Sequence, residues 1–133
     1  MGGWIKCENG HRVYDMLLHD AAIKLSQNRL GKCGKHGKSL HYHVCYKRFA
    51  NDPKAEEQNY EVIKAVRLFP RKQKDGFDPF LLLLQHEDNP RDRKVLPTFW
   101  APDRKGGIRG GQFPPLLATR DWRTLFRKLD IRT

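Results

Sequence analysis

Two short cysteine–histidine pairs are the residues of this sequence whose types and spacing are best suited to chemistry. Three residues separate Cys7 from His11, and two separate Cys33 from His36. A tetrahedral Zn²⁺ site takes four thiolate or imidazole ligands from two short turns of this kind. Glycines at positions 10, 34 and 37 allow the chain to turn tightly beside the ligands. The sequence therefore predicts a zinc site made of Cys7, His11, Cys33 and His36.

Three further residues are alternative ligands. His41, His43 and Cys45 alternate along one predicted strand, and any of them can replace either histidine. The two pairs resemble the ligand pairs of zinc-ribbon and treble-clef proteins, although there the second ligand of a pair is usually a cysteine. Without a metal, Cys7 and Cys33 would be small buried hydrophobic residues. Three cysteines, an odd number with histidines nearby, favour metal binding over disulfides in a reducing compartment.

The predicted zinc has a structural role. Four protein ligands leave no open coordination position for water, and only Glu8 places a carboxylate beside the pairs. The sequence contains no His-Glu-x-x-His motif, no paired-carboxylate spacing and no Walker loop. A metal-dependent nuclease using His41, His43 or His86 with nearby carboxylates is therefore the least favoured function, and no residue is assigned as catalytic.

A helix and a strand are expected to position these ligands. Asp15 is placed to cap a helix that ends between residues 28 and 31 and carries apolar residues on one face, namely Leu17, Leu18, Ala21, Ala22 and Leu25. Residues 40–46 alternate in polarity, which predicts a strand. The expected order over residues 1–50 is ligand pair, helix, ligand pair and strand.

The charge of the chain is strongly positive. Its 133 residues include 26 Lys and Arg against 15 Asp and Glu, which gives a net charge of +11. Residues 1–50 carry +6 and residues 91–133 carry +7, whereas residues 51–59 carry −2 and residues 60–90 are neutral. Because a basic surface attracts phosphates, nucleic acid is the expected partner. The polar segment 51–59 predicts a linker between a zinc-binding module at 1–50 and a second domain at 60–133.

The second domain is predicted to be an antiparallel sheet followed by a helix. Strands are expected at 60–69, 80–85, 94–100 and 113–117, with turns at 70–76 and 89–93 and a basic loop at 103–111. The strand at 80–85 is apolar on both faces and should be central, whereas Pro97 places its strand toward an edge. Thr119 can cap a final helix in which Trp122, Leu125, Phe126 and Leu129 share one face.

The stretch from Lys94 to Leu129 resembles the C-terminal domain of the positive cofactor four family. The matching features are a strand end at Phe99-Trp100, a charged turn containing glycine, Ile108-Arg109-Gly110-Gly111, and Asp121-Trp122-x-x-Leu125. Arg109 and Gly111 match a lysine and a glycine of the family motif, whereas residues 112–115 depart from its basic residues and Gly-Ile. The resemblance implies, for residues 59–130, the family's curved antiparallel sheet with a C-terminal helix. It also implies a homodimer that binds single-stranded DNA in transcription.

A single strand is bound by cations along its backbone and by aromatic faces that stack on its bases. The residues predicted to bind nucleic acid are Arg93, Lys94, Phe99, Trp100, Arg104, Lys105 and Arg109. Adjacent strand residues point to opposite sides, so at most one of Phe99 and Trp100 can stack on a base. We therefore expect an α+β protein, with an N-terminal zinc-knuckle module and a curved sheet, that binds single-stranded DNA or RNA without catalysis.

The main alternative is a small zinc-stabilised adaptor or inhibitor that binds a protein partner through its zinc module and apolar sheet face. The longest apolar run, Phe80–Leu84, is far shorter than the roughly 20 residues that span a bilayer. Residues 1–6 lack the apolar stretch of a secretory signal. The sequence therefore predicts a cytoplasmic protein with no membrane partner.

Overall fold

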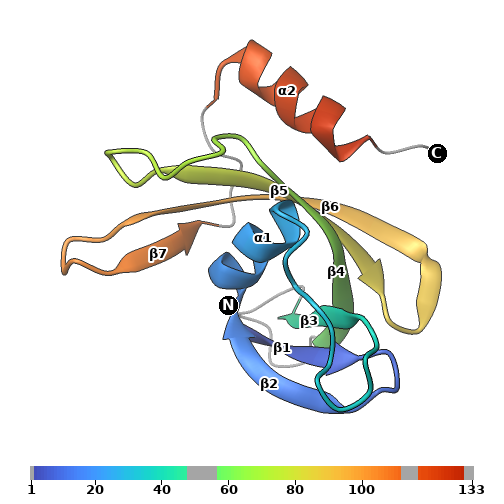
Figure 1. The fold of residues 1–133 in the computed structure, drawn as a ribbon. Coiled ribbons are helices and arrows are strands. Elements are labelled where there is room, and N and C mark those ends of the chain that lie inside the picture. The colour runs from blue at the N-terminus through green and yellow to red at the C-terminus, as the bar shows by residue number, and fades with distance from the viewer. Residues whose placement is uncertain (1, 48–56, 112–116, 131–133) are drawn as a thin grey trace.

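The structure, a computed structural model, describes residues 2–47, 57–111 and 117–130 (Figure 1). These residues form seven strands and two helices. The strands are β1 (Gly2–Cys7), β2 (Arg12–Leu17), β3 (Leu40–Lys47), β4 (Glu57–Arg67), β5 (Asp78–His86), β6 (Asn89–Pro102) and β7 (Ile108–Gly111). The helices are α1 (Leu18–Ser26) and α2 (Thr119–Leu129).

The seven strands form one antiparallel sheet in the order β2-β1-β3-β4-β5-β6-β7. The sheet is strongly curved, with α1 and α2 at different levels of the molecule (Figure 1). The predicted α+β class is confirmed, with a curved antiparallel sheet, one helix in the N-terminal part and one at the C-terminal end. Neighbours in sequence are mostly neighbours in the sheet, except that β2 and β3 lie on either side of β1.

The sheet continues across the predicted linker. β3 pairs directly with β4, and His43 lies opposite Glu61. Residues 57–59, predicted to be linker, are the first residues of β4, because strand pairing through the backbone does not require apolar side chains. Residues 51–56 lie outside the described residues. One core cluster contains Ile5 and Tyr42 from one side of the predicted boundary and Phe80 from the other, so both sides share a core.

β5 is a central strand buried on both faces, as its apolar run predicts. Phe80, Leu82 and Leu84 belong to the core cluster that includes residues of α1, whereas Leu81 and Leu83 pack with Leu125 and Leu129 of α2. Successive side chains of a strand point to opposite faces. The two helices therefore cover opposite faces of the sheet.

Helix α1 begins later than the sequence predicts. Asp15 does not cap it but lies in β2, opposite Trp4 of β1. Leu17 occupies the N-cap position and is 66% exposed, so it is not on the buried face of the helix. The sequence missed β2 because this edge strand exposes most of its side chains and shows no alternation. Leu18, Ala21 and Ala22 are the buried residues of α1, and Leu25 packs against the same core while partly buried, as predicted.

Strand β6 is longer than expected. It begins at Asn89, so the turn predicted at 89–93 is strand, and the preceding turn is formed by Glu87 and Asp88. β6 has a neighbour on each side, but β7 pairs only with Phe99–Pro102. At Pro97 the described part of β6 therefore pairs with β5 alone. One neighbouring strand suits proline, which has no N–H to donate to a second strand. Of the strand expected at 113–117, residues 113–116 lie outside the described residues and Leu117 precedes α2.

Helix α2 follows its predicted apolar stripe in part. Leu125 and Leu129 are buried, Trp122 is half-buried, and Phe126 is 50% exposed. Its N-cap is Ala118, not Thr119, and an alanine side chain has no capping atom. Lys64 Nζ donates a hydrogen bond to the Leu129 carbonyl at 3.0 Å, which ties the end of the helix to β4. In the described part of the chain, neither helix has the length and apolar character that a bilayer crossing requires.

Candidate metal centre and basic surface

The first ligand pair lies in the tight turn between β1 and β2. Cys7 is the last residue of β1, and His11 directly precedes β2. The Gly10 N–H donates to the Cys7 carbonyl at 2.8 Å, and the Cys7 N–H donates to the His11 carbonyl at 3.1 Å. Gly10 has a φ of +87°, a backbone conformation that glycine adopts without strain. This turn brings both side chains to the same end of the hairpin.

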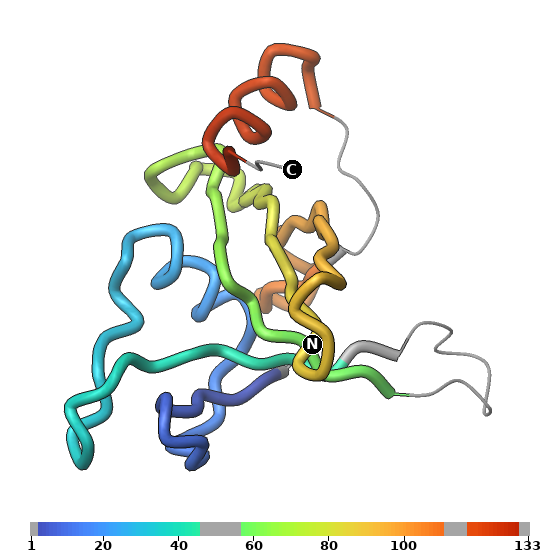
Figure 2. The backbone as a smooth tube through the Cα atoms, turned by 90° about the vertical axis from the view of Figure 1, so that its right-hand side faces the viewer, coloured from blue at the N-terminus to red at the C-terminus, as the bar shows by residue number. Residues whose placement is uncertain are grey.

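The second pair lies in the loop between α1 and β3, which an isolated bridge between Lys32 and Ser39 closes. The Gly37 N–H donates to the Cys33 carbonyl at 2.7 Å, and Gly37 has a φ of +65°. A further backbone bond, from the Glu8 N–H to the Ser39 carbonyl at 3.2 Å, joins this loop to the first turn. Figure 2 shows the two turns at the same end of the molecule, far from α2.

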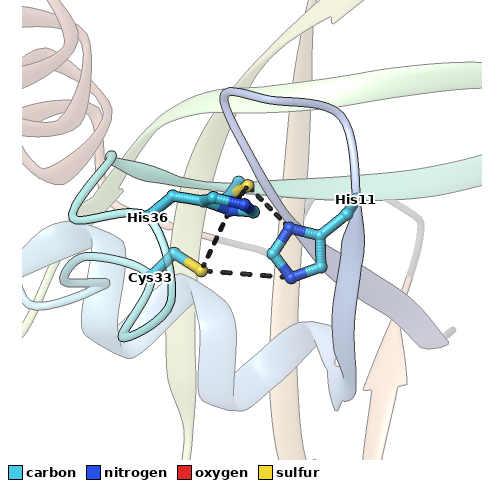
Figure 3. Close-up of side chains that lie close together, drawn as sticks. His11, Cys33 and His36 are labelled. Atoms are coloured by element: carbon cyan, nitrogen blue, oxygen red, sulfur yellow. Dashed lines mark hydrogen bonds between the residues drawn. The ribbon is translucent and has the colours of Figure 1, made fainter.

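The two turns bring all four predicted ligands together. His11, Cys33 and His36 point toward one another (Figure 3), and Cys7 completes the group. Cys7 Sγ lies 2.9 Å from His11 Nδ1 and 3.4 Å from His36 Nδ1. Cys33 Sγ lies 3.9 Å from His11 Nε2 and 3.8 Å from His36 Nδ1. One ligand atom from each residue lies within 4.8 Å of the other three, so the group can hold a metal ion.

These separations are near those of a tetrahedral site with two sulfur and two nitrogen ligands. With metal–sulfur bonds of about 2.3 Å and metal–nitrogen bonds of about 2.05 Å, tetrahedral angles place sulfur and nitrogen about 3.6 Å apart. The four sulfur–nitrogen distances lie on both sides of that value. His11 presents Nδ1 to one sulfur and Nε2 to the other, so binding of one ion selects one of its nitrogens.

The environment of Cys33 favours its thiolate form. Cys7 and Cys33 are 2% and 4% exposed, whereas the two imidazoles are more open to solvent. Burial raises the pKa of the Cys33 thiol. This effect is outweighed by hydrogen bonds from the backbone N–H groups of His36 and Lys35, by the Cys7 side chain and by the Lys35 charge, so the net pKa shift is downward. Thiolates rather than thiols are the ligands of zinc.

The alternative ligands point elsewhere. His41 contacts Glu8 and Glu61, and His43 lies beside Glu87. Cys45 interacts with Glu57, whose charge and hydrogen bond add to the effect of burial and raise the pKa of the thiol. Among the residues that the structure describes, these three side chains are therefore not part of the four-residue group.

A second feature, the basic end of the sheet, consists of six exposed cations on two neighbouring loops and at the start of β7. Residues 68–77 connect β4 to β5, and residues 103–107 connect β6 to β7; both leave the same side of the sheet (Figure 1). The basic end comprises Arg71, Lys72, Lys74, Arg104, Lys105 and Arg109. Within residues 2–47, 57–111 and 117–130, none of the six forms an ion pair.

The two loops meet at their bases. A Cβ atom at Gly76 would lie 2.5 Å from Pro102 Cγ, so the first loop contacts the end of β6. The rings of Phe77 and Phe99 lie 5.7 Å apart at a tilt of 52°, and both are partly exposed. Trp100 is only 7% exposed and stacks on His19 with ring centroids 4.5 Å apart. Of the two aromatic residues predicted to contact bases, Trp100 is therefore the one in the core.

Two other predicted contact residues lie far from this end. Arg93 donates to Gln85 Oε1 at 3.1 Å, and Lys94 donates to Tyr60 Oη at 3.1 Å and pairs with Asp92. Both belong to β6 near its turn with β5, eight or more residues from Pro102. At about 3.3 Å per residue, Lys94 and the β6–β7 loop are roughly 26 Å apart. The structure therefore separates Arg93 and Lys94 from Arg104, Lys105 and Arg109.

Sequence reasoning missed the cations of the β4–β5 loop. Arg71, Lys72 and Lys74 were assigned to a charged turn, and their proximity to the β6–β7 loop depends on the pairing of β5 with β6. The run of three cations within four residues is a signal of a basic loop, but it does not say which other loop it will join.

A buried ionic network lies beneath the basic end. Asp78, 6% exposed, accepts hydrogen bonds from Arg67 Nε at 2.7 Å and from Arg67 Nη2 at 2.8 Å. His19 Nε2 of α1 lies 2.8 Å from the same carboxylate. Burial raises the pKa of Asp78, but the hydrogen bonds and positive charges of His19 and Arg67 lower it more, so the net shift of the pKa is downward. The network joins α1 to the sheet.

Comparisons of the chain with protein-family models, with curated proteins and with solved structures found no match.

Proposed function

We propose that this is a non-catalytic protein that binds single-stranded nucleic acid at the basic end of the sheet, and that a structural zinc ion stabilises its N-terminal part. The observation that carries the proposal is the basic end itself, where six exposed cations without an ion pair among the described residues lie on the same two loops and strand ends as the rings of Phe77 and Phe99. Cations neutralise phosphates and release their counterions, and exposed rings stack on bases regardless of sequence. A surface of this composition suits a flexible single strand.

The proposed zinc ion is held by Cys7, His11, Cys33 and His36. The donor set of two thiolates and two imidazoles is typical of structural zinc, and it leaves no position for a substrate or water. Zinc would join the β1–β2 turn to the 31–38 loop. Transcription as the process and dimerisation remain expectations from the resemblance of residues 94–129 to the positive cofactor four family.

The strength of binding should fall steeply with salt. If all six cations contact phosphates, the slope of log K against log salt concentration is about −4 for a single strand, because each phosphate contributes about −0.7. Between 50 and 200 mM salt the affinity should then fall about 300-fold. Fluorescence anisotropy of a labelled oligonucleotide of about 16 nucleotides measures both the affinity and the slope.

A charge-reversed variant and a matched control locate the surface. Lys72→Glu with Lys105→Glu should weaken binding at least tenfold and make the slope shallower by about 1.4, the share of two phosphates. Arg91→Glu with Arg93→Glu makes the same change of charge at the opposite end of β5 and should leave most of the affinity intact. Equal losses in both variants would place the surface elsewhere. A wild-type protein that binds no single strand at low salt would refute the function and favour the adaptor that binds a protein.

A further inference from the structure

A second group of histidines and carboxylates lies in a groove at the other end of β5 from the basic end. We call this the histidine–carboxylate groove. It is separate from the four-residue Cys/His group, although its rim includes Cys7. The side chains on which the inference depends are Lys6, Glu8, His41, His43, Glu61 and Glu87.

The pairing of three strands brings these residues together. His41 and His43 lie two residues apart on β3, so they project from the same face of the sheet. Glu61 of β4 lies opposite His43, and Lys6 of β1 lies opposite His41. Glu87 enters from the β5–β6 turn, which the Glu87 N–H holds against β4 by donating to the Asn59 carbonyl at 3.0 Å.

Each of the two histidines faces carboxylates. His41 Nδ1 lies 3.2 Å from Glu61 Oε2, and His41 Nε2 lies 3.4 Å from Glu8 Oε1. His43 Nδ1 lies 2.6 Å from Glu87 Oε1. The last contact lacks the directional geometry of a hydrogen bond, so His43 Nδ1 is a buried nitrogen without a hydrogen-bond partner among the described residues. A cation bound between this nitrogen and the Glu87 carboxylate would satisfy both groups.

The charges of the groove are opposite to those of the whole protein. Four carboxylates, from Glu8, Glu61, Glu87 and Asp88, face one ammonium group, that of Lys6, in a chain whose net charge is +11. Lys6 Nζ lies 3.9 Å from Glu87 Oε1 and compensates only part of this charge. The groove therefore attracts cations where most of the surface repels them.

The protonation of His43 suits a metal ligand. Burial lowers the pKa of this imidazole, and the nearby Glu87 and Glu61 carboxylates only partly oppose the effect. The neutral form of an imidazole has a free lone pair on one nitrogen. Neutral imidazole together with carboxylate is a ligand set of zinc, iron, nickel and manganese sites.

We propose that the histidine–carboxylate groove binds a divalent transition-metal ion, with His43 and Glu87 as its principal ligands and His41 and Glu61 as the residues that complete the site. The ligand atoms of the groove do not converge as those of the Cys/His group do. Glu61 and Glu87 are 27% and 23% exposed, so rotation of their side chains can bring their oxygens to a common ion. Because the groove offers fewer strong ligands and is more exposed to solvent, it should bind its ion more weakly than the Cys/His group does.

Cobalt titration tests the proposal because the two sites give different spectra. The Cys/His group gives sulfur-to-cobalt charge transfer, whereas a site of nitrogen and oxygen ligands does not. Metal-free protein should bind one Co²⁺ with charge transfer and then a second, weaker Co²⁺ without it, and native mass spectrometry should count two ions per chain. His43→Gln with Glu87→Gln should weaken the second ion by more than tenfold and leave the charge-transfer band unchanged, since even loss of an outer-shell partner costs about 10–100-fold.

A control variant and a measurement on the wild-type protein complete the test. His86→Gln removes a histidine on the rim of the groove, where His86 Nε2 is already 2.6 Å from Gln58 Oε1, and should retain two ions. If the His43 and Glu87 variant does not fold, broadening of the His41 and His43 ring resonances by Mn²⁺ in the wild-type protein replaces it. One ion per chain, unbroadened rings, or loss of the second ion only in the control would overturn the proposal.

Discussion

Asp78→Asn is the substitution that tests most directly how the fold is held together. The Asp78 carboxylate accepts three short contacts, at 2.7, 2.8 and 2.8 Å, from groups on β4 and α1. The side chains of Asp78, Arg67 and His19 are only 8%, 11% and 18% exposed, so water can replace few of these contacts. Asparagine keeps the shape of the side chain but leaves the Arg67 guanidinium without a counter-charge.

The expected loss of stability is large. Removing one partner of a buried ion pair costs about 3–5 kcal/mol, and asparagine retains one acceptor oxygen, so we expect about 3 kcal/mol. With an unfolding entropy of about 2.1 cal/mol/K per residue, 133 residues give about 0.28 kcal/mol/K. The melting temperature should therefore fall by about 11 °C. Urea and thermal unfolding followed by circular dichroism measure both quantities.

The pH dependence of the same contact has a definite sign. The pKa of Asp78 is lowered in the folded state, whereas an aspartate of the unfolded chain titrates near about 3.9. Below that pH the unfolded chain binds the proton first. The stabilisation from Asp78 is then present above about pH 4 and is lost as the pH falls through the lower folded pKa. The Asn variant should lack this part of the acid-induced loss.

Two comparisons make the prediction refutable. Asp88→Asn removes an exposed carboxylate by the same chemical change and should alter the stability by less than about 0.5 kcal/mol. A loss below about 1 kcal/mol for Asp78→Asn, or a loss equal to that of the control, would show that the network does not stabilise the fold.

Two further predictions concern the metal centre and the C-terminal helix. Chelation of the metal should lower the free energy of unfolding by at least about 2.7 kcal/mol relative to protein with free zinc at a hundredfold its Kd. Cys33→Ser should abolish this response, whereas Cys45→Ser, outside the four-residue group, should keep it. A chelator without effect on the melting temperature would contradict a structural zinc. Leu125→Ala, at a side chain with 0% exposure, should lower the free energy of unfolding in urea by about 2–5 kcal/mol. Phe126→Ala, at 50% exposure, should lower it by less than about 1 kcal/mol. Equal losses would mean that α2 does not pack as described.

The pairing of Cys7 with His11 and of Cys33 with His36 was predictable because the geometry of each pair is local. Each pair is held by a turn of a few residues with a glycine at positive φ, so the sequence spacing alone places the two side chains of a pair together. The apolar run of β5 and the stripe of α2 were predictable for the same reason, since burial on both faces and a helical period are visible in a short window. The binding of single-stranded nucleic acid, the zinc ion and the resemblance of residues 94–129 remain predictions.

Only the tertiary structure decided which distant residues meet. The sequence does not reveal β2, because an exposed edge strand has no pattern of burial, and it predicts a linker at residues 57–59, because their polar side chains do not indicate the backbone pairing with β3. The union of the β4–β5 and β6–β7 loops, the burial of Trp100 under His19, and the histidine–carboxylate groove all depend on strand register. Register is set by packing of the whole sheet and not by any one segment. The sequence by itself therefore determined the local turns and apolar stripes. The pairing of the strands determined which side chains form the basic end and the histidine–carboxylate groove.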